Sequence, residues 1–269
     1  GANTYFATYV ALLTVFTIFI IAIGYNLVVE LFPGGGGGYK VASKLLHPFA
    51  GLVAGSALIV DYVLTITISV ASGADAVFSF LPQEWSMYKI AVEAVIILLL
   101  LALNLRGMKE TIKVLLPLFM GFLIIHAVLI CYGIMAHSSG LLSLLPMTWH
   151  ETQGVAFSSG WLAVLGITLH AYSLGSGTFT GLEAVSNNVQ RLSEPRVATA
   201  KRTMLYMAIS LSFTAGGIML LYLLWNVKPI PGMTLNAVVF QSILGSSPLG
   251  HAILIITLYL EAALLLVAA

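Results

Sequence analysis

Four acidic side chains lie well inside long apolar stretches of the sequence: Asp61, Glu93, Glu183 and Glu261. A charge at the centre of a membrane helix costs about 2.5–3.5 kcal/mol on insertion scales. No Lys or Arg is predicted at a comparable depth, so these acids are expected either to carry a proton or to bind a cation. Glu93 and Glu261 are each isolated on their helices, where a structural, hydrogen-bonded role is as well supported as a proton relay.

Glu183 lies beside a break in the apolar run 160–189. The stretch 173–184 holds three glycines and four hydroxyl residues, and each glycine in a helix interior costs about 0.8–1 kcal/mol relative to alanine. In hydrocarbon, unwound backbone is tolerated only where it is buried in protein or lines a wet cavity. The break therefore predicts an ion or substrate site between two half-helices. The alternative is a glycine-rich kink that only lets helices pack closely. Backbone ligands are expected from Gly175, Ser176, Gly177 and Thr178.

Oxygen-bearing side chains also form a stripe along the segment 61–69. Tyr62, Thr65 and Ser69 are spaced i, i+3 and i+7, which places them on one face of a helix, with Asp61 at the edge of that face. Hydroxyl and carboxylate oxygens are the ligands that hard cations prefer. The stripe favours a cation site, and hydrogen bonding between helices is the alternative.

Membrane helices must position these residues. Hydrophobic residues make up 59% of the 269 residues, charged residues make up 8%, and the mean hydropathy is +1.03. Such values are typical of an all-α polytopic membrane protein. A short helix lying on the surface is predicted over Thr234–Leu244. Hydropathy predicts seven spans: Thr8–Leu31, Phe49–Leu81, Ser86–Leu105, Ile112–Ala136, Gly160–Val189, Thr203–Trp225 and His251–Ala269.

The loops give an orientation. The glycine run 34–38 predicts a tight turn at the membrane surface, followed by a short amphipathic piece, Lys40–Leu46. Nine of the 11 basic residues fall in the first, third and fifth loops. The positive-inside rule then places these loops in the cytoplasm and the N-terminus of this chain outside. An outside start predicts that at least one helix precedes Thr8, so we expect the chain to be part of a longer transporter.

Other classes of function find little support. The single cysteine, Cys131, excludes a disulfide framework. No nucleophile–base pair or metal-binding cluster can be assembled, so we expect neither an enzyme nor a bound metal other than a transported monovalent cation. His126 and His170 are interpreted as interior histidines rather than proton carriers. Neither a cofactor nor a nucleic-acid partner is expected.

Three segments together resemble the amino acid–polyamine–organocation (APC) superfamily: 32–44, 55–65 and 178–187. Within it they are most similar to bacterial potassium–proton symporters of the KUP family, and the resemblance covers essentially the whole chain. It implies an inverted-repeat, LeuT-like transporter fold, with the first and sixth helices broken at mid-membrane. The seven spans would then be helices two to eight. Residues 1–269 would form one incomplete transmembrane domain, with 8–136 in the first repeat and 160–269 in the second.

The resemblance also implies ligands for potassium. Matching positions are Tyr62, Thr65 and Ser69 on the third helix and Thr180 and Glu183 on the sixth. Glu183 would coordinate the cation or carry the coupling proton, and Asp61 is a second candidate for that proton. The proton gradient would supply the energy.

The expected protein is a multi-pass transporter of the bacterial inner membrane, with lipid, protons and potassium as partners. A proton-coupled amino acid permease of the same fold is the main alternative, and a channel or a transporter-like sensor is less well supported. The oligomeric state stays open, with a homodimer of the full-length protein as one option.

Overall fold

The chain is built from helices. The computed structural model describes residues 4–105, 111–179 and 181–268, and every regular element within those ranges is a helix. Six continuous helices are long and apolar enough to cross a membrane: Thr4–Leu31, Pro48–Phe78, Gln83–Ala102, Leu115–Ala136, Arg196–Leu224 and Pro248–Val267. A further span consists of two helices, Trp161–Leu174 and Gly177–Asn187, which meet at an angle of 46°. The predicted seven spans, one of them broken, are therefore confirmed.

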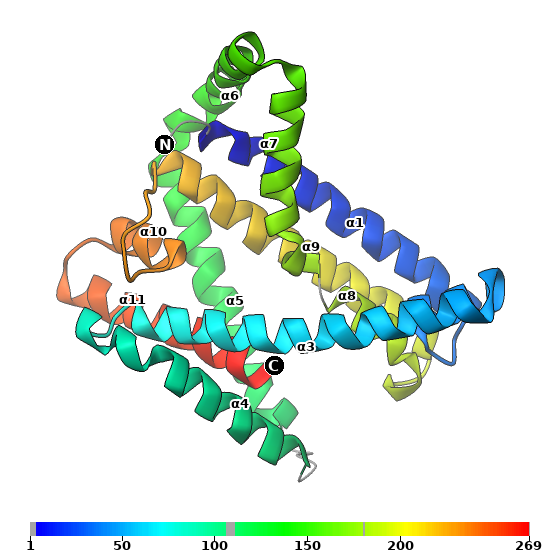
Figure 1. Cartoon of the computed structure of the whole chain (residues 1–269). Helices are drawn as coiled ribbons and strands as arrows, with labels where there is room; N and C mark the ends of the chain where they lie inside the picture. Colours follow the sequence, from blue (N-terminus) through cyan, green and yellow to red (C-terminus); the bar gives the residue numbers. More distant parts are fainter. Residues whose placement is uncertain (1–3, 106–110, 180, 269) are drawn as a thin grey trace. The chain divides into compact units, whose positions relative to one another are not determined.

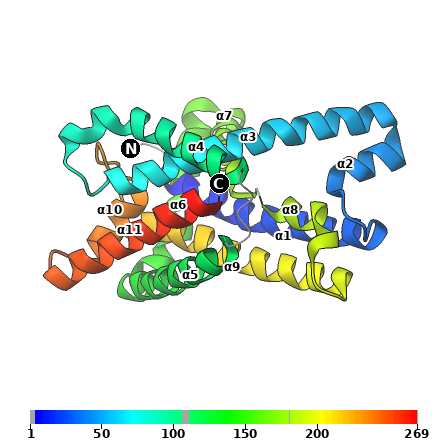
Figure 2. The same cartoon turned by 90° about the horizontal axis from the view of Figure 1, so that it is seen from below.

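Figure 1 labels every α-helix except α2, which is labelled in Figure 2. The helices are α1 (Ala7–Leu31), α2 (Gly37–Val41), α3 (Pro48–Phe78), α4 (Lys89–Leu105), α5 (Thr111–Ala136), α6 (Ser138–Ser159), α7 (Trp161–Leu174), α8 (Leu182–Asn187), α9 (Arg196–Leu224), α10 (Leu235–Leu244) and α11 (Pro248–Ala268). Short 3₁₀ turns cover Thr4–Phe6, Gln83–Tyr88, Ser176–Phe179 and Val189–Arg191, and a π-helical turn covers Ala42–Leu46.

Helix α6 is the one long element that the sequence analysis did not predict. Its composition is mixed, with Ser, Thr, His and Glu among the apolar residues and Pro146 inside the helix. Polar contacts, rather than an apolar face, hold α6 against α1. Tyr9 Oη and Thr152 Oγ1 lie 2.9 Å apart, and Thr148 Oγ1 donates to Thr8 Oγ1 at 3.0 Å. A hydropathy scan cannot detect a helix that is anchored by its hydroxyl groups.

The described helices form two compact units. The first comprises 1–62 and 142–220, and the second comprises 63–141 and 221–269. Each unit thus draws on both halves of the sequence, and the division falls within α3. The predicted repeat boundaries, 8–136 and 160–269, are not these units and stay a prediction.

In the first unit, α8 is buried between two long helices. Leu182 of α8 is fully buried against Ile18 and Ala22 of α1 and Ala208 of α9. A second cluster continues the packing beyond the end of α8, where Val189 meets Val29 and Met204. This packing fixes the short helix that carries Glu183.

The glycine run forms the predicted turn and also contacts the end of α8. Gly35, Gly36 and Gly37 have φ values of +77°, +104° and +43°, a region that side chains with a Cβ disfavour. The N–H of Gly36 donates to the carbonyl of Asn187 at 3.2 Å. The glycines therefore allow the loop to lie directly against the broken span.

In the second unit, α11 packs against α5, and α10 packs against both (Figure 2). Phe240 is the largest of the side chains that α10 buries. The prediction of a short helix here is confirmed, but only one side of it lies at the surface. The buried side chains of α10 are Ala237, Val238, Val239, Phe240 and Ile243.

Thr234 caps α10, because its Oγ1 accepts the N–H of Ala237 at 3.1 Å. Replacing an N-cap threonine by alanine costs about 0.5–2 kcal/mol. We expect Thr234→Ala to lower the free energy of unfolding by an amount in this range, and Thr234→Ser to retain most of the stability. Thermal unfolding of the full-length protein in detergent measures both, and equal losses in the two variants would contradict the capping role.

Candidate cation and substrate site

The first unit contains a cavity of about 330 Å³ that brings two predicted site residues together. Asp61 lines it from α3 and Glu183 from α8. The remaining described lining residues are uncharged, so none of them is basic. They are Gly38, Tyr39, Ala54, Ala57, Leu58 and Asn187.

Local backbone geometry places these side chains. Helix α8 begins directly after Gly181, whose φ of +96° is accessible to glycine. Glu183 is therefore in the first turn of the second half-helix. On the other wall, a Cβ on Gly55 would lie 3.2 Å from the ring of Tyr39, so this glycine lets α2 approach α3 closely.

Only one of the two carboxylate oxygens of Glu183 is hydrogen-bonded. Tyr25 of α1 donates its hydroxyl to Oε2 at 3.3 Å. The other oxygen, Oε1, is buried and has no hydrogen-bond partner among the described residues. A buried acceptor without a partner is costly, and a cation or a proton would satisfy it.

A second polar contact ties α8 to α3. The amide Nδ2 of Asn187 donates to the hydroxyl of Tyr62 at 2.9 Å. Asn187 and Glu183 are four residues apart, and both line the cavity. This hydrogen bond fixes the position of the Tyr62 hydroxyl, although the residue as a whole is 40% exposed.

The predicted ligands are only partly assembled within the first unit. Asp61, Tyr62 and Glu183 belong to it, whereas Thr65 and Ser69 follow on the same helix in the second unit. Thr180 lies outside the described residues. The ligand role of the other five and the proton-coupling role of Asp61 remain predictions.

The break itself is confirmed, with α7 ending at Leu174 and a 3₁₀ turn over Ser176–Phe179. Within it, the N–H of Gly175 donates to Tyr172 at 3.1 Å, and that of Thr178 donates to Gly175 at 3.0 Å. These two N–H groups are therefore engaged, and the carbonyl of Gly175 already accepts the hydrogen bond from Thr178. A carbonyl oxygen has a second lone pair, which Gly175 could still offer to a cation. The coordinating role proposed for Gly175, Ser176, Gly177 and Thr178 stays a prediction.

The sequence analysis missed Tyr25 and Asn187 as members of the site. Asn187 could have been found, because its i+4 spacing from Glu183 puts both on one face of α8. Tyr25 could not, because nothing in the sequence indicates which face of α1 meets α8.

The expectation that no basic residue accompanies the intramembrane acids is wrong for Glu93, which lies 3.8 Å from Lys89 Nζ. Lys89 also pairs with Asp75, and Lys201 pairs with Glu30. Asp61 and Glu183 make no ion pair within the described ranges, which distinguishes them from these three acids.

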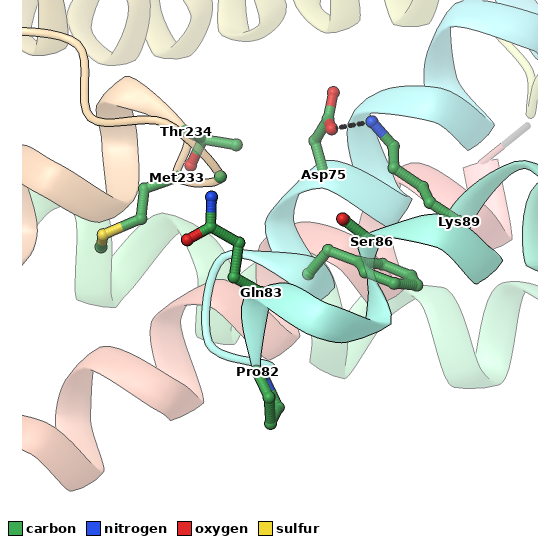
Figure 3. A pocket seen from close by; sticks show the side chains of 9 residues that line it. Asp75, Pro82, Gln83, Ser86, Lys89, Met233 and Thr234 are labelled. Carbon is green, nitrogen blue, oxygen red and sulfur yellow. Dashed lines mark hydrogen bonds and ion pairs between the residues drawn. The ribbon is translucent and has the colours of Figure 1, made fainter.

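The second unit has a cavity of similar size, about 340 Å³, shown in Figure 3. It lies where the end of α3, the start of α4 and the loop before α10 converge. The Asp75–Lys89 pair faces it together with Gln83, Ser86 and Thr234. Because its two charged groups neutralise each other, it is a weaker candidate for an ion. No group of three or more His, Cys, Asp or Glu that could hold a metal occurs in the described part of the chain.

Comparison with known proteins identifies the family. The family model described as amino acid permease matches residues 2–268. A curated relative, the potassium transporter KimA of Bacillus subtilis (strain 168), is 32% identical over 216 residues, which are 79% of this chain and 34% of the relative. The chain thus spans about a third of the length of that relative. Its helices, its broken span and this match over nearly its whole length place the chain in the amino acid permease family of the APC superfamily, a family of multi-span membrane transporters.

Proposed function

We propose that this chain forms part of a secondary active transporter that takes up potassium with protons. The observation that carries the proposal is the pairing of Asp61 and Glu183 in one cavity that no described basic residue lines. The name of the KimA relative, a potassium transporter, points to the same substrate class.

The electrostatics of the cavity favour a cation. Two carboxylates that line one cavity repel each other, and a bound cation or proton removes that repulsion. Glu183 offers a buried oxygen without a donor, and Tyr62 offers a fixed hydroxyl. The ligands are all oxygens, the type that potassium prefers. Thr65, Ser69 and Thr180 are proposed to complete the set, with carbonyl groups of the stretch 175–178.

Coupling to protons follows from the same pair. When potassium occupies the cavity, one carboxylate coordinates it and the other takes a proton, so both negative charges are compensated before the site is exposed to the other side. Glu183 is our first candidate for the coupling proton and Asp61 the second. The proton gradient then drives the uptake without a cofactor.

The broken span suits alternating access. Transporters with broken helices move one bundle against the other around a central site. We propose that the two helices of the broken span take part in such a movement, in an inner membrane, with the N-terminus of this chain outside and a homodimer as one assembly of the full-length protein.

An amino acid–proton symporter is the second candidate, because the family model is described as an amino acid permease. In that case the substrate ammonium group would meet Asp61 and Glu183, and its carboxylate would need N–H donors at the broken helix. The engaged N–H groups of Gly175 and Thr178 make this less favourable.

Uptake by the full-length protein in proteoliposomes separates the candidates. We expect rubidium or potassium to accumulate only when a proton gradient is imposed, and amino acids added in excess not to compete. Liposomes with a collapsed gradient are the matched control. Gradient-driven amino acid entry without potassium uptake would overturn the potassium proposal, and flux that ignores the gradient would indicate a channel.

A further inference from the structure

We propose that Glu261 in α11 is a second proton-binding carboxyl group, located in the second unit, and that its hydrogen bond with Asn236 links its protonation to the position of α10. The link to transport rests on the proposed proton-coupled function. The site itself rests only on the geometry around Glu261.

The two oxygens of Glu261 have very different surroundings. Oε1 accepts a hydrogen bond from Asn236 Nδ2 at 2.6 Å. Oε2 is buried and has no hydrogen-bond partner among the described residues. The Asn236 amide is itself fixed, because the hydroxyl of Tyr222 donates to its Oδ1. Tyr222, Asn236 and Glu261 therefore form a chain of hydrogen bonds that ends at an oxygen without a donor.

This arrangement suits a neutral acid better than a carboxylate. A buried negative charge is costly unless it is paired and fully hydrogen-bonded. Among the side chains that the structure describes, no Lys, Arg or His nitrogen forms an ion pair with Glu261. Because Asn236 donates to Oε1, the proton of the neutral acid belongs on Oε2, the oxygen that no donor reaches.

The described side chains that pack against α11 bring no positive charge to this carboxyl group. Helix α10 has no titratable residue. Helix α3 approaches at Gly73, near the backbone of Ala262, and its titratable residue in this unit, Asp75, is paired with Lys89. The titratable residue of α9 in this unit is Tyr222, which is linked to Glu261 through Asn236. In α5 the side chains of residues 111–114 are not described, and the titratable side chains after them are His126, Cys131 and Tyr132.

His126 is held by one hydrogen bond and a ring contact, while its Nε2 is buried without a hydrogen-bond partner among the described residues. Its side chain is fully buried, and its Nδ1 lies 2.9 Å from the carbonyl of Phe122. Its ring meets Phe240 of α10 edge-on, with 5.2 Å between the ring centroids. Neutral histidine fits this apolar position, so His126 does not provide a counter-charge for Glu261.

Helix α10 is placed to control access to Glu261. Asn236 and Phe240 are four residues apart on one face of α10, and they contact Glu261 and His126 respectively. Moving α10 away would remove the donor to Oε1 and admit water to the carboxyl group. Glu261 would then release its proton readily, whereas the closed position of α10 favours the protonated acid.

Infrared difference spectroscopy of the full-length protein in liposomes tests the site directly, because a protonated carboxyl group has its own C=O band. We expect Glu261→Gln to remove one such band at neutral pH. Glu93→Gln, which changes an acid paired with Lys89 in the same unit, is the matched control and should leave that band in place. A band unchanged by Glu261→Gln would overturn the proposal.

Asn236→Ala provides a test that does not require the Glu261 variant to fold. We expect the Glu261 band to shift in frequency, because Asn236 then no longer donates a hydrogen bond to Oε1. An unchanged frequency would refute the link to α10. The spectra do not depend on transport, so the band can persist even if the protein fails to take up potassium with protons. In that case the proposed function is refuted, whereas the proposed protonation site is supported.

Discussion

Glu183→Gln is expected to lower the apparent affinity for potassium about 10- to 100-fold and to make potassium uptake independent of the proton gradient. Hydrogen bonds and contacts to a charged group contribute about 1.5–3 kcal/mol, and each 1.4 kcal/mol corresponds to about a factor of ten in affinity. Glutamine keeps the shape of the side chain and can still accept from Tyr25. It loses the negative charge and the ability to take up a proton.

The concentration dependence of rubidium uptake, measured with and without an imposed gradient, gives both quantities. Glu84→Gln is the matched control, because Glu84 is an exposed acid in the turn before α4. Asp61→Asn should weaken binding as well, and its residual response to the gradient shows which of the two acids carries the proton. Uptake by Glu183→Gln that equals that of the control, with its gradient dependence intact, would contradict both roles of Glu183.

The sequence predicted the fold well because membrane spans are specified by composition. Apolar runs about as long as the bilayer is thick leave few alternatives to a helix, and the glycines and hydroxyl residues before Glu183 marked the break. Helix α6 escaped prediction because it is held by hydroxyl contacts with α1 rather than by an apolar face.

The site was predictable only in part. Asp61 and Glu183 stand out in the sequence because placing an ionised acid inside an apolar membrane helix costs free energy at any position. The partners that orient them depend on how helices are rotated and how closely they approach, and sequence spacing within one helix does not contain that information. Tyr25, which donates to Glu183, and Asn236, which donates to Glu261, are examples of such partners. The pairing of Glu93 with Lys89 is a different case, because the two are four residues apart on α4 and their spacing in the sequence already places them on one face.

Gly37→Ala is the second variant for which we expect a large effect, in this case on stability. A Cβ at this position would lie 2.0 Å from Asn187 Oδ1 and 2.8 Å from Ser186 Oγ. Overpacking of this kind typically costs about 1–3 kcal/mol. The left-handed backbone at Gly37, with a φ of +43°, adds about 1–2 kcal/mol for a residue with a Cβ. Unfolding of the purified full-length protein in detergent measures the sum.

The neighbouring Gly34→Ala is the matched control. Its Cβ would have only the end of the Lys40 side chain nearby, at 3.7 Å, so we expect nearly unchanged stability. Equal losses for the two variants would mean that the loop tolerates no side chain at all, and the specific contact with α8 would be refuted.

The double variant Gly37→Ala/Asn187→Ala separates the two costs. Removing the Asn187 side chain relieves the closest contact but leaves the backbone strain at position 37, so the double variant should recover part of the stability lost in Gly37→Ala. It also removes the hydrogen bond to Tyr62. Potassium affinity should therefore fall in Asn187→Ala alone, even though that variant has no clash. We expect Asn187→Ala to lose potassium affinity but not stability, and Gly37→Ala to lose stability. This result would show that Asn187 both accommodates the glycine loop against α8 and positions the side chains around the cavity.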